Sequence, residues 1–276
     1  MRPVLQQNKI YKRHLQRRKV FLRFVMPVFL LGAAAVLLLL LPQLDLKNVS
    51  VRGSNTIPVE DIAGIANMFL EEKIAGIFPR RNMFLFRAAA LETRILAALP
   101  AMREVRVSFS LQEGVFIEVA ERDLWGIYCA VSVSEAEVVD DAGDTCFYIA
   151  TDGALFDVAP RLTGNSIMRI VDMRGNAGNN AMGDYAVGEK TARDVQDVGA
   201  WLSKHYAIAA REVLLGRLFE DTVDVTTEEG WRIVFDEKTD ISRALENLAL
   251  VFEKHIANRA ALEYVDIRFD GKIFYK

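Results

Sequence analysis

The sequence predicts an α+β fold with a single N-terminal transmembrane helix, a β-α-α-β-β domain, and then a mixed α/β domain with a largely antiparallel sheet. Three observations predict it. An uncharged apolar run occupies residues 24–41, hydrophobic positions at 45–121 alternate between strand and helix periods, and two amphipathic helices interrupt several short strands at 122–276. The expected organisation is a basic cytoplasmic tail at 1–23, a transmembrane helix at 24–41, and domains at 45–121 and 122–276.

The N-terminal segment has the charge pattern of a membrane anchor. Residues 1–23 contain eight lysines and arginines and no acidic residue, so the net charge of −3 combines +8 here with −11 elsewhere. The 18 uncharged residues that follow would form a helix about 27 Å long, close to the thickness of the hydrocarbon layer. A cleaved signal peptide is the competing interpretation, but the sequence LPQLDLK after the run offers no small-residue cleavage site. Because basic flanks stay cytoplasmic, we expect a single-pass protein whose bulk lies outside.

The segment 45–121 reads as one small domain. A short strand at 46–52 precedes a helix for which Thr56 is the expected N-cap, and a second helix is expected at 87–99, before Pro100. Apolar and polar residues then alternate at 105–110 and 115–120 around a turn at 112–114, which predicts a hairpin. Two helices can cover one face of such a three-stranded sheet and share one core with it.

The segment 122–276 predicts a second and larger domain. Strands are expected near 125–133, 146–149, 154–156, 167–172, 212–215, 221–226 and 231–235. Helices are expected at 190–206 and from Asp240 to about residue 256, where apolar residues recur with the helical period. The dipeptide Asp270-Gly271 between two β-rich runs is a strong signal for a terminal hairpin at 264–275.

Several strings together resemble a known family. They are VSVRGSNTIPVEDI, NMFLF and LAALPAMREVRVSFSLQEGVFIEVAER in the first domain, and FYIATDGALF, TTEEGWRIVF and YVDIRFDGKIFY in the second. The first set resembles a POTRA domain, and the whole order is similar to that of the bacterial cell-division family FtsQ (DivIB). One departure is the turn Gln112-Glu113-Gly114, where the family often has proline.

The resemblance implies a non-enzymatic, membrane-anchored scaffold of the divisome that links early division proteins to septal peptidoglycan synthesis. It implies a location at the division septum in the bacterial inner membrane and a partner like the FtsB–FtsL complex. Other expected contacts are the lipid bilayer at 24–41 and, weakly, a second copy of the chain; no nucleic acid and no cofactor are expected.

The expected partner site is the last hairpin, because an edge strand offers unpaired backbone groups to which a partner strand can add. A simpler interpretation is that Val265, Ile267 and Phe269, or their alternates, only fill the core. Both can hold, since the faces and the edge of a sheet are separate surfaces. The expected contact residues are Tyr264, Arg268, Phe269, Ile273, Phe274 and Tyr275.

The two cysteines, Cys129 and Cys146, bracket a polar loop between two expected strands. Two interpretations remain open for them: a disulfide, which persists outside the cytoplasm, or two separate buried thiols.

No catalytic arrangement stands out. The chain is 51% hydrophobic and 26% charged, which is ordinary for a folded protein, and its net charge of −3 gives no support to nucleic-acid binding. His205 and His255 fall late in expected helices, where a cation suits the helix dipole. The alternatives to a scaffold are a membrane-anchored extracytoplasmic ligand sensor or enzyme, and a POTRA-containing outer-membrane assembly factor, for whose β-barrel too little chain remains.

Overall fold

The computed structural model describes residues 23–34, 36–131, 133–134, 137–138, 145–160, 167–175, 180–256 and 258–276. The expected basic tail, apart from Arg23, lies outside these residues. The chain divides into two compact units: residues 1–95 with 104–119, and residues 96–103 with 120–276. Each unit is described below by itself.

The predicted transmembrane helix is wrong. Within the residues that the structure describes, no helix is both long and apolar enough to cross a membrane. This finding also contradicts the predicted location as a single-pass protein of the bacterial inner membrane, because that location depended on a spanning helix at 24–41. A short 3-10 helix, Pro42–Leu44, follows the apolar run.

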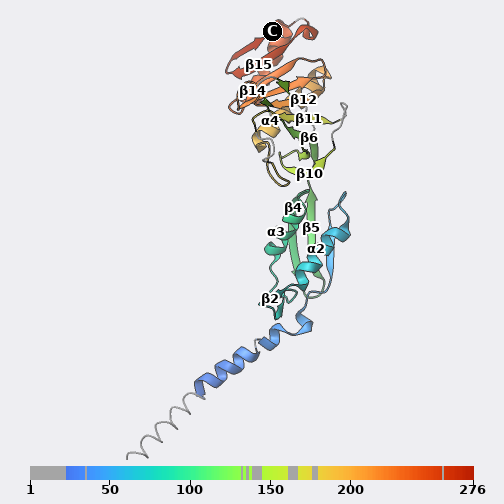
Figure 1. The fold of residues 1–276 in the computed structure, drawn as a ribbon, viewed down its shortest axis with the longest axis vertical. Coiled ribbons are helices and arrows are strands. Elements are labelled where there is room, and N and C mark those ends of the chain that lie inside the picture. The colour runs from blue at the N-terminus through green and yellow to red at the C-terminus, as the bar shows by residue number, and fades with distance from the viewer. Residues whose placement is uncertain are drawn as a thin grey trace, which may run out of the picture. The chain divides into compact units, whose positions relative to one another are not determined.

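The first unit contains a three-stranded sheet in the order β1-β5-β4 and two helices (Figure 1). Strand β1 (Val49–Arg52) is parallel to β5 (Gly114–Glu121), which lies beside β4 (Met102–Ser110). Helices α2 (Val59–Glu71) and α3 (Ala88–Ala98) each bury one apolar stripe, with members such as Ile62 and Leu91. A small hairpin that the sequence did not predict, β2 (Lys73–Ile74) with β3 (Phe78–Pro79), lies between the two helices in the chain.

The second unit is built on a mixed sheet of nine strands in the order β10-β9-β6-β11-β12-β13-β14-β15-β16. The parallel pairs are β6 with β11, β11 with β12, and β14 with β15; the other five pairs are antiparallel. Figure 1 shows β10 and β15 at opposite ends of this sheet, with the C terminus beside β15. The strand bounds are Leu124–Ala130 (β6), Cys146–Ala150 (β9), Leu155–Ala159 (β10), Met168–Asp172 (β11), Ala210–Leu215 (β12), Thr222–Thr227 (β13), Arg232–Asp236 (β14), Tyr264–Phe269 (β15) and Lys272–Tyr275 (β16). Two further short strands, β7 (Val133–Ser134) and β8 (Glu137–Val138), pair only with each other.

One face of the large sheet is covered by two helices, α4 (Glu189–Tyr206) and α5 (Ile241–Lys254). Their apolar stripes join the inward residues of the strands in one core, whose largest fully buried members include Trp231, Tyr128 and Phe235. Strand residues that alternate with these core residues point to the opposite face. That second face carries a smaller apolar cluster of Ile127, Cys146 and Ala159 together with several charged side chains.

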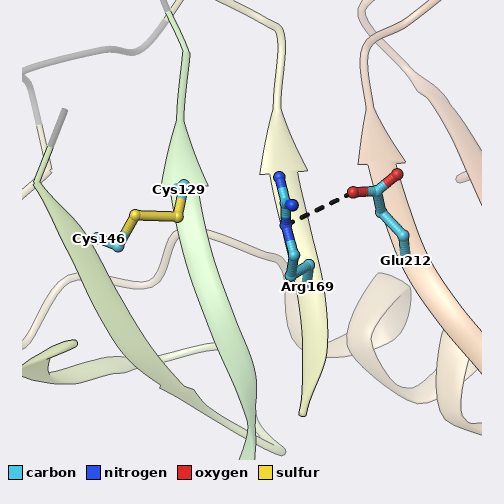
Figure 2. The surroundings of a disulfide bond; sticks show 4 residues. All are labelled: Cys129, Cys146, Arg169 and Glu212. Atoms are coloured by element: carbon cyan, nitrogen blue, oxygen red, sulfur yellow. Dashed lines mark ion pairs between the residues drawn. A yellow bond between two sulfur atoms is a disulfide. The ribbon is translucent and has the colours of Figure 1, made fainter. Parts of the chain in front are cut away.

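The second face holds the disulfide and a row of ion pairs. Cys129 of β6 and Cys146 of β9 are directly opposite in register and are joined by a disulfide bond. Figure 2 shows this bond beside the ion pair of Arg169 and Glu212, whose Nε and Oε1 atoms lie 3.6 Å apart on β11 and β12. Further along the sheet, the fully buried carboxylate of Asp224 lies 3.1 Å from the guanidinium of Arg217.

Candidate functional site: the edge strand β16

Strand β16 is the last strand of the nine-stranded sheet, so no strand of the described chain pairs with its outer side. It is joined to β15 by the turn at Asp270 and Gly271, where Gly271 has a φ of +70°. Only glycine adopts such a conformation without strain, which explains the strong turn signal in the sequence.

The hydrogen bonds of the hairpin fix which backbone groups point outward. The N–H of Lys276 donates to the carbonyl of Tyr264 at 3.2 Å, and the carbonyl of Lys276 accepts from the N–H of Tyr264 at 3.4 Å. Directly opposed residues of an antiparallel pair alternate between bonded and non-bonded positions. With Asp266 opposite Phe274 as the next bonded pair, the N–H and C=O groups of Ile273 and Tyr275 point away from β15.

The expected site residues divide into core and surface. Val265 and Ile267 are 0% and 3% exposed and belong to the main core, and Ile273 packs against that core. Phe269, Phe274 and Tyr275 are instead about half exposed, at 49%, 51% and 46%. Tyr264 and Arg268 are half-buried. Val265 and Ile267 therefore fill the core, as the simpler interpretation predicts, whereas Phe269 does not.

A register shift explains the exposure of Phe269. The hairpin is in register from Val265 to Asp266, but Phe269 then pairs with Lys272, so two residues of β15 oppose one of β16. Such an extra residue interrupts the alternation of the strand and turns the following side chains. The ring of Phe269 consequently lies 5.3 Å from that of Phe274 in an edge-to-face arrangement.

Arg268 is held in place beside this aromatic pair. Its Nε atom donates to Oδ1 of Asp266 at 2.9 Å, and a second nitrogen donates to Oδ2 at 2.5 Å. The hydrogen bonds to the Asp266 carboxylate raise the pKa of Arg268 above its already high ordinary value. The guanidinium lies 5.5 Å from the ring centre of Phe269 and 6.0 Å from that of Phe219, within the range of cation–π attraction.

Phe219 is the residue of this surface that the sequence did not indicate. It lies in the loop between β12 and β13 and is 64% exposed. Phe219 lies far from the terminal hairpin in the sequence. Its contact with Arg268 therefore cannot be seen from the sequence alone. The only available signal was an isolated aromatic residue in the loop sequence GRLFED.

A groove of about 250 Å³ lies on the helix side of the hairpin. Its walls include Ala244 of α5 together with Ile267 and Ile273. Arg243 of α5 and Asp270 of the turn form an ion pair at 3.4 Å between exposed side chains. The groove therefore borders the hairpin on the side that faces α5.

The other predicted site residues are the two cysteines, and the structure brings them together in a disulfide that links β6 to β9. The bond lies six strands from β16 in the sheet order, so it is not part of the edge surface. Among the described residues, no group of three or more His, Cys, Asp or Glu side chains could hold a metal ion. What the edge offers chemically is backbone pairing, aromatic contact and one positioned cation.

No protein-family model matches the chain, and no curated protein matches its sequence significantly.

Proposed function

We propose that this protein is a non-enzymatic scaffold of the bacterial cell-division machinery that binds its partner by strand addition to β16. The observation that carries the proposal is the outward-pointing backbone of Ile273 and Tyr275, flanked by the exposed aromatic pair Phe269 and Phe274. Long unprotected edges are usually avoided in soluble folds because they pair with other chains. An edge that instead displays aromatic side chains suits a specific partner, since aromatic residues dominate binding energy at interfaces.

The identity of the partner rests on the resemblance to the FtsQ family, in which the YVDIRF-like hairpin faces the FtsB–FtsL pair. On this proposal, the protein links early division proteins to septal peptidoglycan synthesis, and the partner contributes a short strand. Phe219, Arg268 and the groove beside α5 then give specificity through the side chains of that strand.

A matched pair of substitutions tests strand addition. Tyr275→Pro removes an N–H that points away from β15, whereas Tyr275→Thr removes the aromatic ring and keeps that N–H. Neither breaks a hydrogen bond between β15 and β16, so both variants should remain folded. We expect Tyr275→Pro to bind an FtsB–FtsL complex about fivefold more weakly than Tyr275→Thr, because one backbone hydrogen bond is worth about 1 kcal/mol. Equal affinities of the two variants in a calorimetric titration would refute pairing at this edge.

The role in division has its own test. Depletion of the protein in its native bacterium should give filamentous or chained cells with unfinished septa. Cells that divide normally after depletion would show that the assignment to the division machinery is wrong, whatever the affinity at β16.

A further inference from the structure

The small hairpin of the first unit ends in exposed apolar side chains. Residues 71–77 are all exposed, and Ile77 at its tip is 61% exposed. The turn is tight: Ala75 and Gly76 both have positive φ angles, of 51° and 72°, and the N–H of Ile77 donates to the carbonyl of Ile74 at 3.2 Å. The turn therefore projects two isoleucines into solvent.

The same segment carries more cations than anions. Residues 71–87 contain four cations (Lys73, Arg80, Arg81 and Arg87) and two anions (Glu71 and Glu72), although the whole chain has a net charge of −3. Arg80 pairs with Glu72 at 3.2 Å, and Arg81 pairs with Asp45 at 2.9 Å. Within the part of the chain that the structure describes, no ion pair involves Lys73 or Arg87, and both are exposed. Two cations of this segment, of which Lys73 belongs to the hairpin itself, are thus exposed and without an ion-pair partner among the described residues.

Buried hydrogen bonds hold this segment in place. The side chain of Asn82, fully buried, donates through Nδ2 to the carbonyl of Leu39 at 3.1 Å and accepts at Oδ1 from the N–H of Phe84 at 3.0 Å. The N–H of Met83 donates to the carbonyl of Leu44 at 2.9 Å. Phe84 nevertheless points outward and is 61% exposed. The exposed apolar residues are therefore presented by an ordered support.

We propose that residues 72–87 dock the protein onto an anionic lipid surface. Ile74, Ile77 and Phe84 would enter the boundary between headgroups and acyl chains, and Lys73 and Arg87 would lie at the level of the lipid phosphates. Apolar residues flanked by cations have this affinity, because burial of apolar surface adds to attraction by anionic lipids. A projecting tip also fits a deformable surface better than it fits a small ligand, since ligand sites are concave.

This docking needs no helix that crosses the lipid layer, and it is separate from the edge of β16. It goes beyond the proposed role in division, because neither partner binding nor depletion would reveal it. The two ideas therefore succeed or fail independently.

The test is a spin label placed at the tip of the full-length chain. Both native cysteines are paired in the disulfide, so Ile77→Cys provides the one reactive thiol among the described residues. Val59→Cys is the matched control, because Val59 is also an exposed β-branched residue and begins α2, about 18 Å along that helix from Glu71. Collision rates with oxygen, which partitions into lipid, and with a water-soluble nickel chelate report immersion of each label.

With vesicles of equal parts phosphatidylcholine and phosphatidylserine, the label at 77 should gain oxygen collisions and lose nickel collisions, and the label at 59 should not change. Vesicles of phosphatidylcholine alone should give a smaller shift at 77. Adding Lys73→Gln and Arg87→Gln should lower the fraction of immersed label about fivefold for each lost charge where binding is far from saturation. An unchanged label at 77 with both vesicle types, or equal immersion at 77 and 59, would overturn the proposal.

Discussion

At the scale of single residues, one buried polar network of the second unit is centred on Asp172 at the end of β11. Its buried carboxylate accepts from the hydroxyl of Tyr128 at 2.6 Å and from Nε of Arg174 at 2.9 Å. Burial by itself raises the pKa of Asp172, but the hydrogen bonds from Arg174 and Tyr128 outweigh it and hold that pKa below its ordinary value. Burial and the neighbouring carboxylate raise the pKa of Tyr128, so its hydroxyl stays protonated and donates. The network ties β6 to β11 and stabilises the middle of the sheet.

Replacing Asp172 should therefore be costly. Asp172→Asn leaves the half-buried guanidinium of Arg174 without its counter-charge, and we expect a loss of about 3 kcal/mol in the free energy of unfolding. Tyr128→Phe removes one hydrogen bond and should cost about 1 kcal/mol. Urea denaturation measures both. Glu189→Gln, which breaks an exposed ion pair with Arg193 on α4, is the control and should cost only a few tenths of a kcal/mol.

The same carboxylate predicts an acid limb in the stability profile. A group whose pKa is lower in the folded state stabilises the fold above its unfolded pKa, here the ordinary 3.8, and this contribution is lost as the pH falls through the folded value. The free energy of unfolding should thus decrease from about pH 5 downward. In Asp172→Asn that decrease should be shallower, as followed by urea titrations at several pH values. An identical slope in both proteins would show that Asp172 does not contribute.

Helix caps show what single residues in the sequence could and could not indicate. Asp240 was expected at the start of its helix, and its side chain does accept from the N–H of Arg243. Thr56 was expected as the other N-cap, but α2 begins at Val59 with Pro58 as its N-cap. The reason is local, since a residue before proline disfavours helical angles, and Ile57 therefore delays the helix.

At the scale of elements, strong periodicity located the long helices and weak periodicity missed the short strands. The helix expected at 190–206 is α4 (Glu189–Tyr206), and the one expected from Asp240 is α5 (Ile241–Lys254). Strands β2 and β3 have only two residues each, which is too few to show any alternation. The register shift before Phe269 was equally hidden, because a bulge depends on pairing with another strand.

The disulfide should stabilise the second unit. Its cysteines are 17 positions apart in the sequence, and closing a loop of this length in the unfolded chain is worth about 3 kcal/mol in the simple entropic model. Reduction with a dithiol should lower the free energy of unfolding by about this amount. The double variant Cys129→Ser with Cys146→Ser should be destabilised to a similar extent and should not respond to the reductant. A wild-type protein that is equally stable with and without reductant would contradict this.

The turn before β16 offers a test of hairpin geometry. At Gly271 an added Cβ would meet no atom within 4 Å, so only the positive φ angle opposes substitution. Gly271→Ala should destabilise the protein by about 1–2 kcal/mol, and Gly271→Asn by less, because asparagine adopts this conformation more readily. Gly64→Ala, inside α2, is the control and should not destabilise the protein, since Gly64 has no positive φ angle and an added Cβ would meet no atom within 4 Å. Thermal unfolding of the three variants gives the order.

At the scale of the whole molecule, the sequence indicated the elements but not their neighbours. In the large sheet β11 lies between β6 and β12, although β9 and β10 intervene in the chain. Such pairing is set by contacts between distant residues, and local periodicity does not report them. The same limit explains why the contact between Phe219 and Arg268 was not predicted, since the two residues are far apart in the sequence.

The whole-molecule error concerned the apolar run at 24–41. Its composition predicted a spanning helix, but among the described residues no helix is long and apolar enough to cross a membrane.

The central claim, that a partner strand adds to β16, is tested most directly by amide hydrogen exchange of the full-length protein. The outward N–H groups of Ile273 and Tyr275 should exchange quickly in the free protein, and exchange should slow markedly when an FtsB–FtsL complex is bound. The N–H of Lys276, already bonded to Tyr264, should change less. Binding of the complex without added protection at Ile273 and Tyr275 would contradict the account.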